Sequence, residues 1–419
     1  MIEPCAASLS HGAWTNQPSI ICATDRVGCT GRRSFDAGLA LHRESAQTIR
    51  RAAQTLAETP LQLSILLPTN RHGPVTISRI AQACSWAGPK IQVIVRDNSG
   101  NADKRALLPH FKREHCEIIS VDPCEPLENY SELLRLAKGD FVFCMSDDDQ
   151  CIDRAILALP DVIERSGGDA TVAAVTGAYA LESPQGTSVF TYKDVDSDDP
   201  AARVAGYLSY GGPNMLFYSV LRRQVAERVL EFMKAMPVYL SFHDQILCLL
   251  YLLSGKYIKL QRLFYVYDIG VWGARDTAQK RDIEFYQAAG LDPAANKLQW
   301  LLCGFEGAAM IMNATEFPAY PMQQRQAIAD LWFTTMFNRF KRDTRSTNDS
   351  AHTAEADKLC AKIAGATGQL SFERVLADIS GFFALFSKER AQAYFEFWGS
   401  VLSRRRPFAP PQKAAAGKR

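Results

Sequence analysis

Three consecutive aspartates, Asp147-Asp148-Asp149, directly follow Ser146 and the apolar run 141–145. Holding like charges this close together costs free energy, and a bound divalent cation removes that cost. Mg²⁺ typically takes one or two protein carboxylates and completes its shell with water and substrate phosphates. The cluster therefore predicts a site for Mn²⁺ or Mg²⁺ and a diphosphate. The alternative is a solvated acidic turn at the start of a helix, where carboxylates suit the helix dipole.

Two further carboxylates could join this chemistry. Asp97 follows the apolar run 91–95, where a carboxylate can accept hydrogen bonds from a base or a ribose. The stretch 97–100 is also a good ordinary turn. Asp244 stands at the start of a predicted helix and could act as a general base toward an attacking hydroxyl. Its alternative role is a helix N-cap, and we interpret the neighbouring His243 as structural.

Two residues after the last predicted strand could close over a bound donor. They are Trp272 and Arg275, and an arginine there could pair with phosphate oxygens. Neither a GxxxxGK[ST] loop nor a convincing GxGxxG motif is present, so ATPase and dehydrogenase functions lack support.

Four strands that alternate with helices would position these residues. The predicted strands are 63–67, 91–95, 117–121 and 141–145, and the helices between them are about 77–84, 102–113 and 130–137, the last stopped by Gly139. The alternation predicts an α/β fold with a mostly parallel sheet flanked by helices. In such sheets ligands bind beyond the carboxyl ends of the strands. The polar clusters 69–71, 97–100 and 146–149 should therefore meet at one edge.

The rest of the chain predicts further elements and a division into four parts. The expected elements are a helix over 152–165, strands at 171–175, 187–192 and 263–267, and an apolar helix from His243 to Gly255. Beyond about residue 276 the pattern is helical. We expect a partly helical N-terminal extension (1–60), a catalytic α/β domain (61–275), a helical C-terminal region (276–403) and a disordered basic tail (404–419).

The composition is that of a globular protein. The 419 residues are 47% hydrophobic and 22% charged, and the formal net charge of +2 gives no reason to expect a nucleic-acid partner. The eleven cysteines form no CxxC pair, which is typical of a reducing cytosol. The longest apolar run, 246–253, is far shorter than the ~20 residues of a membrane span, and no signal-peptide pattern is visible. We expect a cytoplasmic protein with at most peripheral membrane contact through Arg404–Arg406 and Lys418-Arg419.

The segment from about Leu63 to Asp268 resembles the family 2 glycosyltransferases, which have the GT-A fold. The sequence ILLPTNR at 65–71 is similar to the family's opening strand and its PTYNR loop, with one residue missing. The sequence IVRDNSG at 94–100 resembles the second strand, which carries a nucleotide-contacting aspartate.

Two more motifs carry the resemblance. AKGDFV at 137–142 followed by SDDD at 146–149 is similar to the DXD region, in the form found in the abequosyltransferase-like branch. That branch handles deoxysugars of surface polysaccharides. His243-Asp244-Gln245 with Gly255-Lys256 resembles the family's E-D region, with His in place of Glu.

The resemblance implies an inverting, metal-dependent hexosyl or deoxyhexosyl transfer in surface glycan or polysaccharide biosynthesis. The donor would be a nucleoside-diphosphate sugar, with a UDP-sugar as first choice, and the acceptor a hydroxyl of a glycan or lipid-linked substrate. The implied nucleotide and diphosphate contacts are Pro68, Thr69, Arg71, Asp97, Asp147 and Asp148. The implied ligands of Mn²⁺ or Mg²⁺ are Asp148 and Asp149, and the implied base is Asp244. No QxxRW-type motif follows, so we do not expect a processive synthase.

Two other functions stay open. A sugar nucleotidyltransferase uses a similar sheet, but it usually needs a glycine-rich basic loop after its first strand, and 68–73 is a poor version of one. A degenerate member of the family would bind a nucleotide sugar without catalysis, or act as a scaffold through its helical region.

Overall fold

The computed structural model describes nine stretches of the chain, all within one unit that extends from Glu58 to Arg419. They are residues 61–166, 169–183, 186–209, 214–240, 242–268, 275–313, 320–342, 350–366 and 371–403, and the side chains of 275–279 and 281–282 are not described. The predicted extension (1–60), the predicted tail (404–419) and Trp272 lie outside the described residues.

Four parallel strands form the first half of a mixed sheet, in the order β3-β2-β1-β4. Their bounds are β1 (Leu63–Thr69), β2 (Ile91–Asp97), β3 (Cys116–Ser120) and β4 (Phe141–Cys144). The apolar runs of β1, β2 and β4 are almost wholly buried. Strands covered on both faces need such continuous hydrophobic sequence, which is why these runs predicted them.

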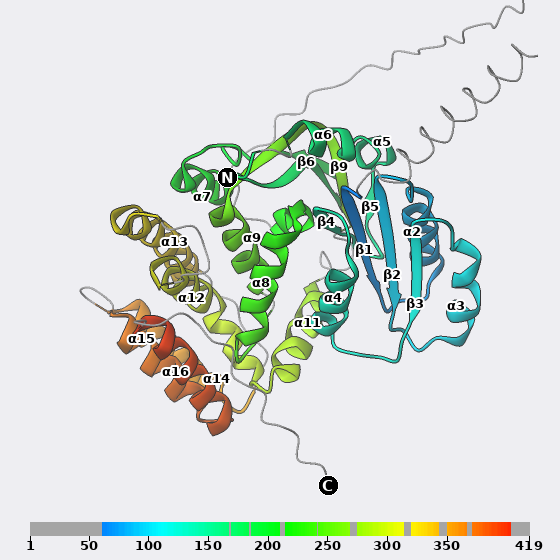
Figure 1. Cartoon of the computed structure of the whole chain (residues 1–419). Helices are drawn as coiled ribbons and strands as arrows, with labels where there is room; N and C mark the ends of the chain where they lie inside the picture. The colour runs from blue at the N-terminus through cyan, green and yellow to red at the C-terminus, as the bar shows by residue number, and fades with distance from the viewer. Residues whose placement is uncertain are drawn as a thin grey trace, which may run out of the picture. The chain divides into compact units, whose positions relative to one another are not determined.

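The connections put helices on both faces of this half-sheet (Figure 1). The chain steps from β1 to β2 and β3 through α2 (Pro74–Ser85) and α3 (Ala102–Leu107), then returns to the other side of β1 through α4 (Pro126–Leu136). Because such crossovers are right-handed, reversing the direction moves α4 to the opposite face from α2. The reversal creates a switch point between β1 and β4, where α/β sheets bind ligands.

The second half of the sheet continues from β4 in the order β8-β6-β9-β5, with β7 on β6. The bounds are β5 (Gln150–Cys151), β6 (Val172–Ser183), β7 (Gly186–Phe190), β8 (Val220–Arg222) and β9 (Lys256–Asp268). The long β6–β9 pairing is parallel, whereas β8, β5 and β7 pair antiparallel with their neighbours. The predicted α/β class, with a mostly parallel sheet flanked by helices, is confirmed.

The other regular elements among the described residues are helices. Between the strands lie α5 (Asp153–Ile156), α6 (Leu159–Ser166), α7 (Pro200–Ser209), η2 (Asn214–Tyr218), α8 (Arg223–Ala235) and α9 (His243–Ser254). After β9 follow α11 (Arg275–Ala288), η3 (Pro293–Leu298), α12 (Gln299–Asn313), α13 (Met322–Arg342), α14 (Thr353–Ala364), α15 (Phe372–Phe383) and α16 (Lys388–Leu402). The predicted helical C-terminal region is thus confirmed. None of the described helices combines the length and apolar character that a membrane crossing requires.

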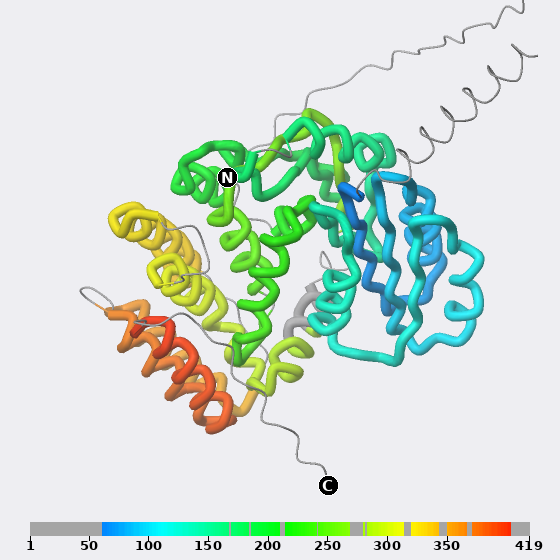
Figure 2. The backbone as a smooth tube through the Cα atoms, viewed as in Figure 1, coloured from blue at the N-terminus to red at the C-terminus, as the bar shows by residue number. Residues whose placement is uncertain are grey.

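The helix α12 links the sheet half of the molecule to the last helices. It is buried along nearly its whole length and packs against α9, α13, α15 and α16. Figure 2 shows the last helices, in orange to red, next to it. A helix buried on all sides must be mostly apolar, as α12 is, and its buried Glu306 is an exception that has hydrogen-bond partners.

The helix bounds differ from the predicted ones at two prolines and one glycine. The predicted helix 102–113 ends at Leu107 and continues as a 3₁₀ turn, Leu108–Phe111, with Pro109 in its first turn. The predicted helix 152–165 is two helices, and Pro160 lies in the first turn of the second. Gly139 does not stop α4, which ends at Leu136. Its lack of a side chain serves packing instead, because a Cβ there would lie 2.6 Å from the carbonyl carbon of Leu63.

Candidate active site at the carboxyl edge of the sheet

A buried lysine, Lys104, organises the ends of β1 and β2. Its Nζ donates to Oγ1 of Thr69 at 2.7 Å and to the backbone carbonyl of Arg71 at 2.6 Å, and it lies 2.9 Å from Oδ1 of Asp97. Both members of the Lys104–Asp97 pair are 1% exposed at the side chain. A buried ammonium needs such a full set of partners, since an unpaired one is strongly destabilising.

Asp97 keeps one oxygen without a partner. Its Oδ1 accepts the Lys104 contact and the Ser99 backbone N–H at 3.1 Å. Its Oδ2 is buried and has no hydrogen-bond partner among the described residues. A buried acceptor left unpaired costs free energy, so the site favours a ligand that brings a donor to this oxygen.

Asp147 joins the ends of β1 and β4. Leu66 pairs with Cys144 in the parallel ladder, and extending that register three residues brings Thr69 opposite Asp147. The Thr69 hydroxyl accordingly donates to Oδ2 of Asp147 at 2.6 Å, and Arg71 forms an ion pair with Oδ1. Asp147 is 2% exposed, so it is not part of a solvated turn.

The next two aspartates differ in environment. Asp148 is 39% exposed at the side chain, accepts from the Ser146 hydroxyl and lies 2.9 Å from Nη2 of Arg71. Asp149 is buried and accepts from the Tyr265 hydroxyl at 2.7 Å and from the Asp268 backbone N–H at 3.1 Å. Burial raises the pKa of Asp149 to about 7, so its ionised form would gain from a nearby positive charge.

Asp244 lies in the first turn of α9 without capping it. The helix begins at His243, and no side-chain cap is formed among the described residues, so the N-cap role is wrong. Oδ2 of Asp244 instead accepts from Nδ2 of Asn214 at 2.9 Å. Burial raises the pKa of Asp244, while hydrogen bonds from Asn214 and the Tyr239 hydroxyl favour its ionised form.

Tyr218 packs on a partner of the acidic cluster. Its ring stacks on that of Tyr265, with centroids 4.6 Å apart, and Tyr265 is the hydrogen-bond partner of Asp149. Burial raises the pKa of the Tyr218 hydroxyl, and the negative charges of Asp149 and Asp244 both add to the effect.

The described residues thus bring most of the predicted site together. A contact chain runs from Asp97 through Lys104, Thr69, Asp147 and Arg71 to Asp148. Pro68 lies in β1 and is only half-buried, and no polar contact of its ring is possible. Trp272 is outside the described residues, and so is the side chain of Arg275.

Four residues of the candidate site were not predicted. Lys104, Asn214 and Tyr265 contact the carboxylates, and Tyr218 stacks on Tyr265, but they belong to elements that meet only in the folded chain. Only Lys104 could have been found from the sequence. It lies four residues before the apolar Leu108 in a predicted helix, and this spacing places both residues on the same face, which is buried at Leu108.

The described residues contain no group of three or more His, Cys, Asp or Glu side chains arranged for a metal. The exposed Asp148 and the buried Asp149 nevertheless fit the chemistry of Mg²⁺, which usually takes one or two carboxylates and completes its shell with phosphates and water.

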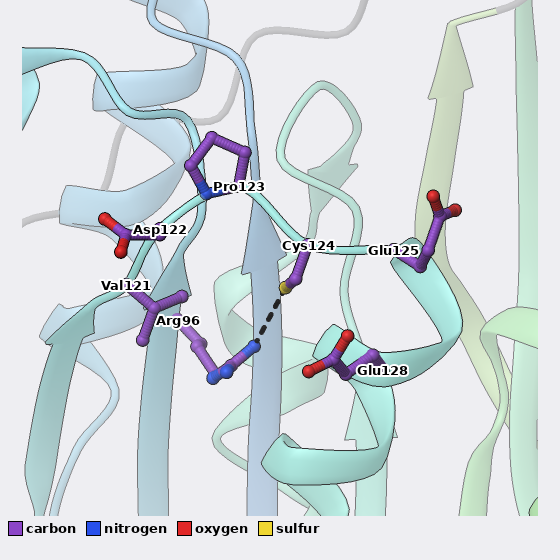
Figure 3. A pocket seen from close by; sticks show the side chains of 7 residues that line it. All are labelled: Arg96, Val121, Asp122, Pro123, Cys124, Glu125 and Glu128. Carbon is purple, nitrogen blue, oxygen red and sulfur yellow. Dashed lines mark hydrogen bonds between the residues drawn. The ribbon is translucent and has the colours of Figure 1, made fainter. Parts of the chain in front are cut away.

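A cavity of about 630 Å³ lies beside the site on the opposite side of β2 (Figure 3). Arg96 precedes Asp97 and points the other way, since side chains alternate along a strand. Figure 3 shows the Arg96 guanidinium directed at Cys124, with Glu128 nearby. The carboxylate cluster does not line this cavity, so we do not assign the site chemistry to it.

Comparison with known proteins gives distant structural similarities. No protein-family model and no curated protein matches the sequence. Among solved structures, S. aureus TarS 1–349 in complex with UDP-GlcNAc is 13% identical with a TM-score of 0.45, covering 82% of this chain and 90% of that one. The mannosyltransferase PcManGT from Pyrobaculum calidifontis, in complex with GDP-Man and Mn²⁺, is 14% identical with a TM-score of 0.38, covering 87% of this chain and 96% of that one. The function is therefore argued from the residues of the site itself.

Proposed function

We propose that the protein is a glycosyltransferase that moves a sugar from a nucleoside-diphosphate donor to a hydroxyl acceptor, with inversion at the sugar carbon. We also propose, from the motif resemblance, that it is a family 2 glycosyltransferase of the GT-A fold, in the abequosyltransferase-like branch. The proposal takes residues 61–275 as the catalytic domain and 276–403 as a helical region attached to it.

One observation carries the proposal: the carboxylates at the ends of β2 and β4 are joined through Lys104, Thr69 and Arg71, and Asp97 has a buried, unpartnered oxygen. An N–H of a nucleobase or a ribose hydroxyl would supply the missing donor. Lys104 and Thr69 hold Asp97 and Asp147 rigidly, and a preorganised site loses less entropy when it binds.

The diphosphate would lie next to Arg71 and the exposed Asp148. The Arg71 side chain is 42% exposed, so its guanidinium is open to phosphate oxygens. We assign Asp148 and Asp149 as the residues that would hold Mn²⁺ or Mg²⁺. The cation would supply positive charge for the leaving nucleoside diphosphate.

Asp244 would accept the proton of the attacking hydroxyl. A general base works best when its pKa lies near the working pH, and burial moves the pKa of Asp244 upward from the usual value. Asn214 holds the carboxylate by a hydrogen bond of 2.9 Å.

The direct test is an assay of the purified protein with UDP-, GDP- and dTDP-sugars, with and without Mn²⁺, against a panel of glycan and lipid-linked acceptors. We expect transfer or slow hydrolysis of one donor class. Pyrophosphate release from a nucleoside triphosphate would identify a nucleotidyltransferase instead, and inertness toward every donor would contradict the proposal.

A further inference from the structure

A buried hydrogen-bond network joins the first turn of α9 to the helical region. Nε2 of His243 lies 3.0 Å from Oε2 of Glu306 on α12, and the Tyr394 hydroxyl on α16 donates to Oε1 of Glu306 at 2.8 Å. All three residues are at most 1% exposed. Polar groups buried this deeply are fixed by their hydrogen bonds, because losing a partner leaves a costly unpaired group.

The histidine ring has hydrogen-bond partners at both nitrogens. Nδ1 of His243 lies 2.7 Å from the Leu240 backbone nitrogen and 3.0 Å from the Leu240 carbonyl oxygen. Nε2 lies on the Glu306 side of the ring. The ring orientation is therefore determined at both nitrogens.

The histidine ring is connected in turn to Asp244. The Tyr239 ring stacks on the His243 ring, with centroids 5.2 Å apart and an interplanar angle of 18°. Asp244 follows His243 directly in the first turn of α9. A change in the orientation of His243 would therefore shift the turn that carries Asp244.

The start of α9 depends on this network because it lacks the usual anchor. Among the described residues no side chain caps the helix, and Phe242 occupies the N-cap position. Phe242 cannot accept a hydrogen bond through its side chain, and its ring stacks on His243 instead. The first turn of α9 is therefore held by His243 through Glu306, together with the Asp244–Asn214 hydrogen bond.

We propose that Glu306, supported by Tyr394, is a positioning residue for Asp244, and that the helical region thereby aligns the base of the active site. The inference rests on the proposed function, in which Asp244 takes the proton of the acceptor. Misplacing a catalytic group by about 1 Å can cost roughly 100-fold in rate, so a residue outside the site can affect turnover.

Two conservative variants test the network. Glu306→Gln keeps the side-chain shape but removes the carboxylate charge and replaces one acceptor oxygen with an NH₂ donor, so both hydrogen bonds lose their charge assistance and the Tyr394 hydroxyl has to turn round to accept. Tyr394→Phe removes only the hydroxyl. The matched control is Val401→Ala, which leaves a cavity on α16 at a fully buried position outside the network.

The measurements are kcat, the KM values of donor and acceptor, donor affinity and hydrogen exchange in the first turn of α9. We expect Glu306→Gln to lower kcat about 10- to 100-fold with donor affinity unchanged, and to speed exchange at the start of α9. Tyr394→Phe should show a smaller loss in the same direction. Val401→Ala should lower the melting temperature and leave kcat unchanged.

The outcomes separate the inference from the proposed function. If the wild type transfers sugar and both network variants keep its kcat, the inference is overturned and the proposed function stands. The same holds if Val401→Ala loses as much kcat as Glu306→Gln, because general destabilisation then explains the loss. A wild type that transfers no sugar overturns both. If Glu306→Gln does not fold, the kcat of Tyr394→Phe decides whether the inference stands.

Discussion

Asp244 combines two consequences of burial in one carboxylate. Burial raises its pKa, which suits a general base, and it also makes the ionised form costly in the folded protein. Asn214 and Tyr239 offset part of this cost. Activity and stability should therefore respond in different ways when the charge is removed.

For activity, we expect Asp244→Asn to lower kcat by roughly 10²- to 10⁴-fold, the usual contribution of a general base. Donor affinity should persist, because the proposed nucleotide contacts lie at the ends of β1, β2 and β4. Steady-state transfer kinetics with a donor-binding measurement check this. Asp161→Asn, on the exposed face of α6, is the control for removing one negative charge. Wild-type turnover in Asp244→Asn would remove Asp244 from the mechanism.

For stability, the effect should depend on pH. A folded-state pKa above the unfolded value means that the folded protein binds the proton more tightly, so stability falls as pH rises from about 4 through the raised pKa. Asp244→Asn removes this dependence. Urea unfolding at a series of pH values should show the variant gaining free energy of unfolding relative to wild type across that window. If the difference in free energy of unfolding between variant and wild type is constant with pH, the pKa of Asp244 is not raised by burial.

Lys104 should matter more for folding than its position on a short helix suggests. Lys104→Met leaves Asp97 buried and unpaired, which typically costs about 3 to 5 kcal/mol. Denaturant unfolding measures the loss. Lys90→Met, which breaks an exposed ion pair with Glu164, is the matched control and should change stability little. Equal effects of the two variants would show that the Lys104–Asp97 pair is not buried.

The chemistry-bearing carboxylates could be predicted because each follows a recognisable element. Asp97 and Asp147 come directly after buried apolar runs, and Asp244 opens an apolar helix. The residues around them could not be predicted. Tyr218, Tyr265 and Asn214 reach the site only because β4, β8, β6 and β9 pair in that order. Local sequence contains no information on that order.

At the scale of elements, the parallel half of the sheet was predictable and the other half only in part. Strands β1, β2 and β4 are apolar runs bounded by turn residues, so their existence was clear from the sequence. Strand β8 has three residues, too few to show a period. Helix α8 was missed although its buried residues recur at helical spacing.

Close packing at Gly139 ties β1 to the start of β4. Its N–H donates to the Ser64 hydroxyl at 2.8 Å, and no room exists for a Cβ against the backbone of Leu63. We expect Gly139→Ala to destabilise the protein by about 1 to 3 kcal/mol, the usual cost of overpacking. Thermal unfolding measures it. Gly399→Ala, in α16 with nothing near the added Cβ, should be neutral or stabilising. The same loss at both glycines would contradict the close contact.

At the scale of the molecule, the helical region is connected to the α/β part through hydrogen bonds at both ends of α9. The Tyr320 hydroxyl donates to the carbonyl of Leu253 at the end of α9, and Glu306 binds His243 at its start. Helix α9 is therefore held at both ends, and its first turn carries the candidate base. The sequence predicted the helical region but not this connection, because the histidine, glutamate and tyrosine lie far apart in the chain.

The central claim is that Asp97 and the aspartate cluster form one site for a nucleoside diphosphate. The most direct test is the melting temperature of the wild type, Asp97→Asn and the control Asp161→Asn with nucleoside diphosphates, with and without Mn²⁺. A ligand at 100 times its Kd adds about 2.7 kcal/mol, so at least one nucleotide should raise the melting point of the wild type and the control, and more so with Mn²⁺. The rise should vanish in Asp97→Asn. No shift with any nucleotide, or a shift that survives in Asp97→Asn, would contradict the account.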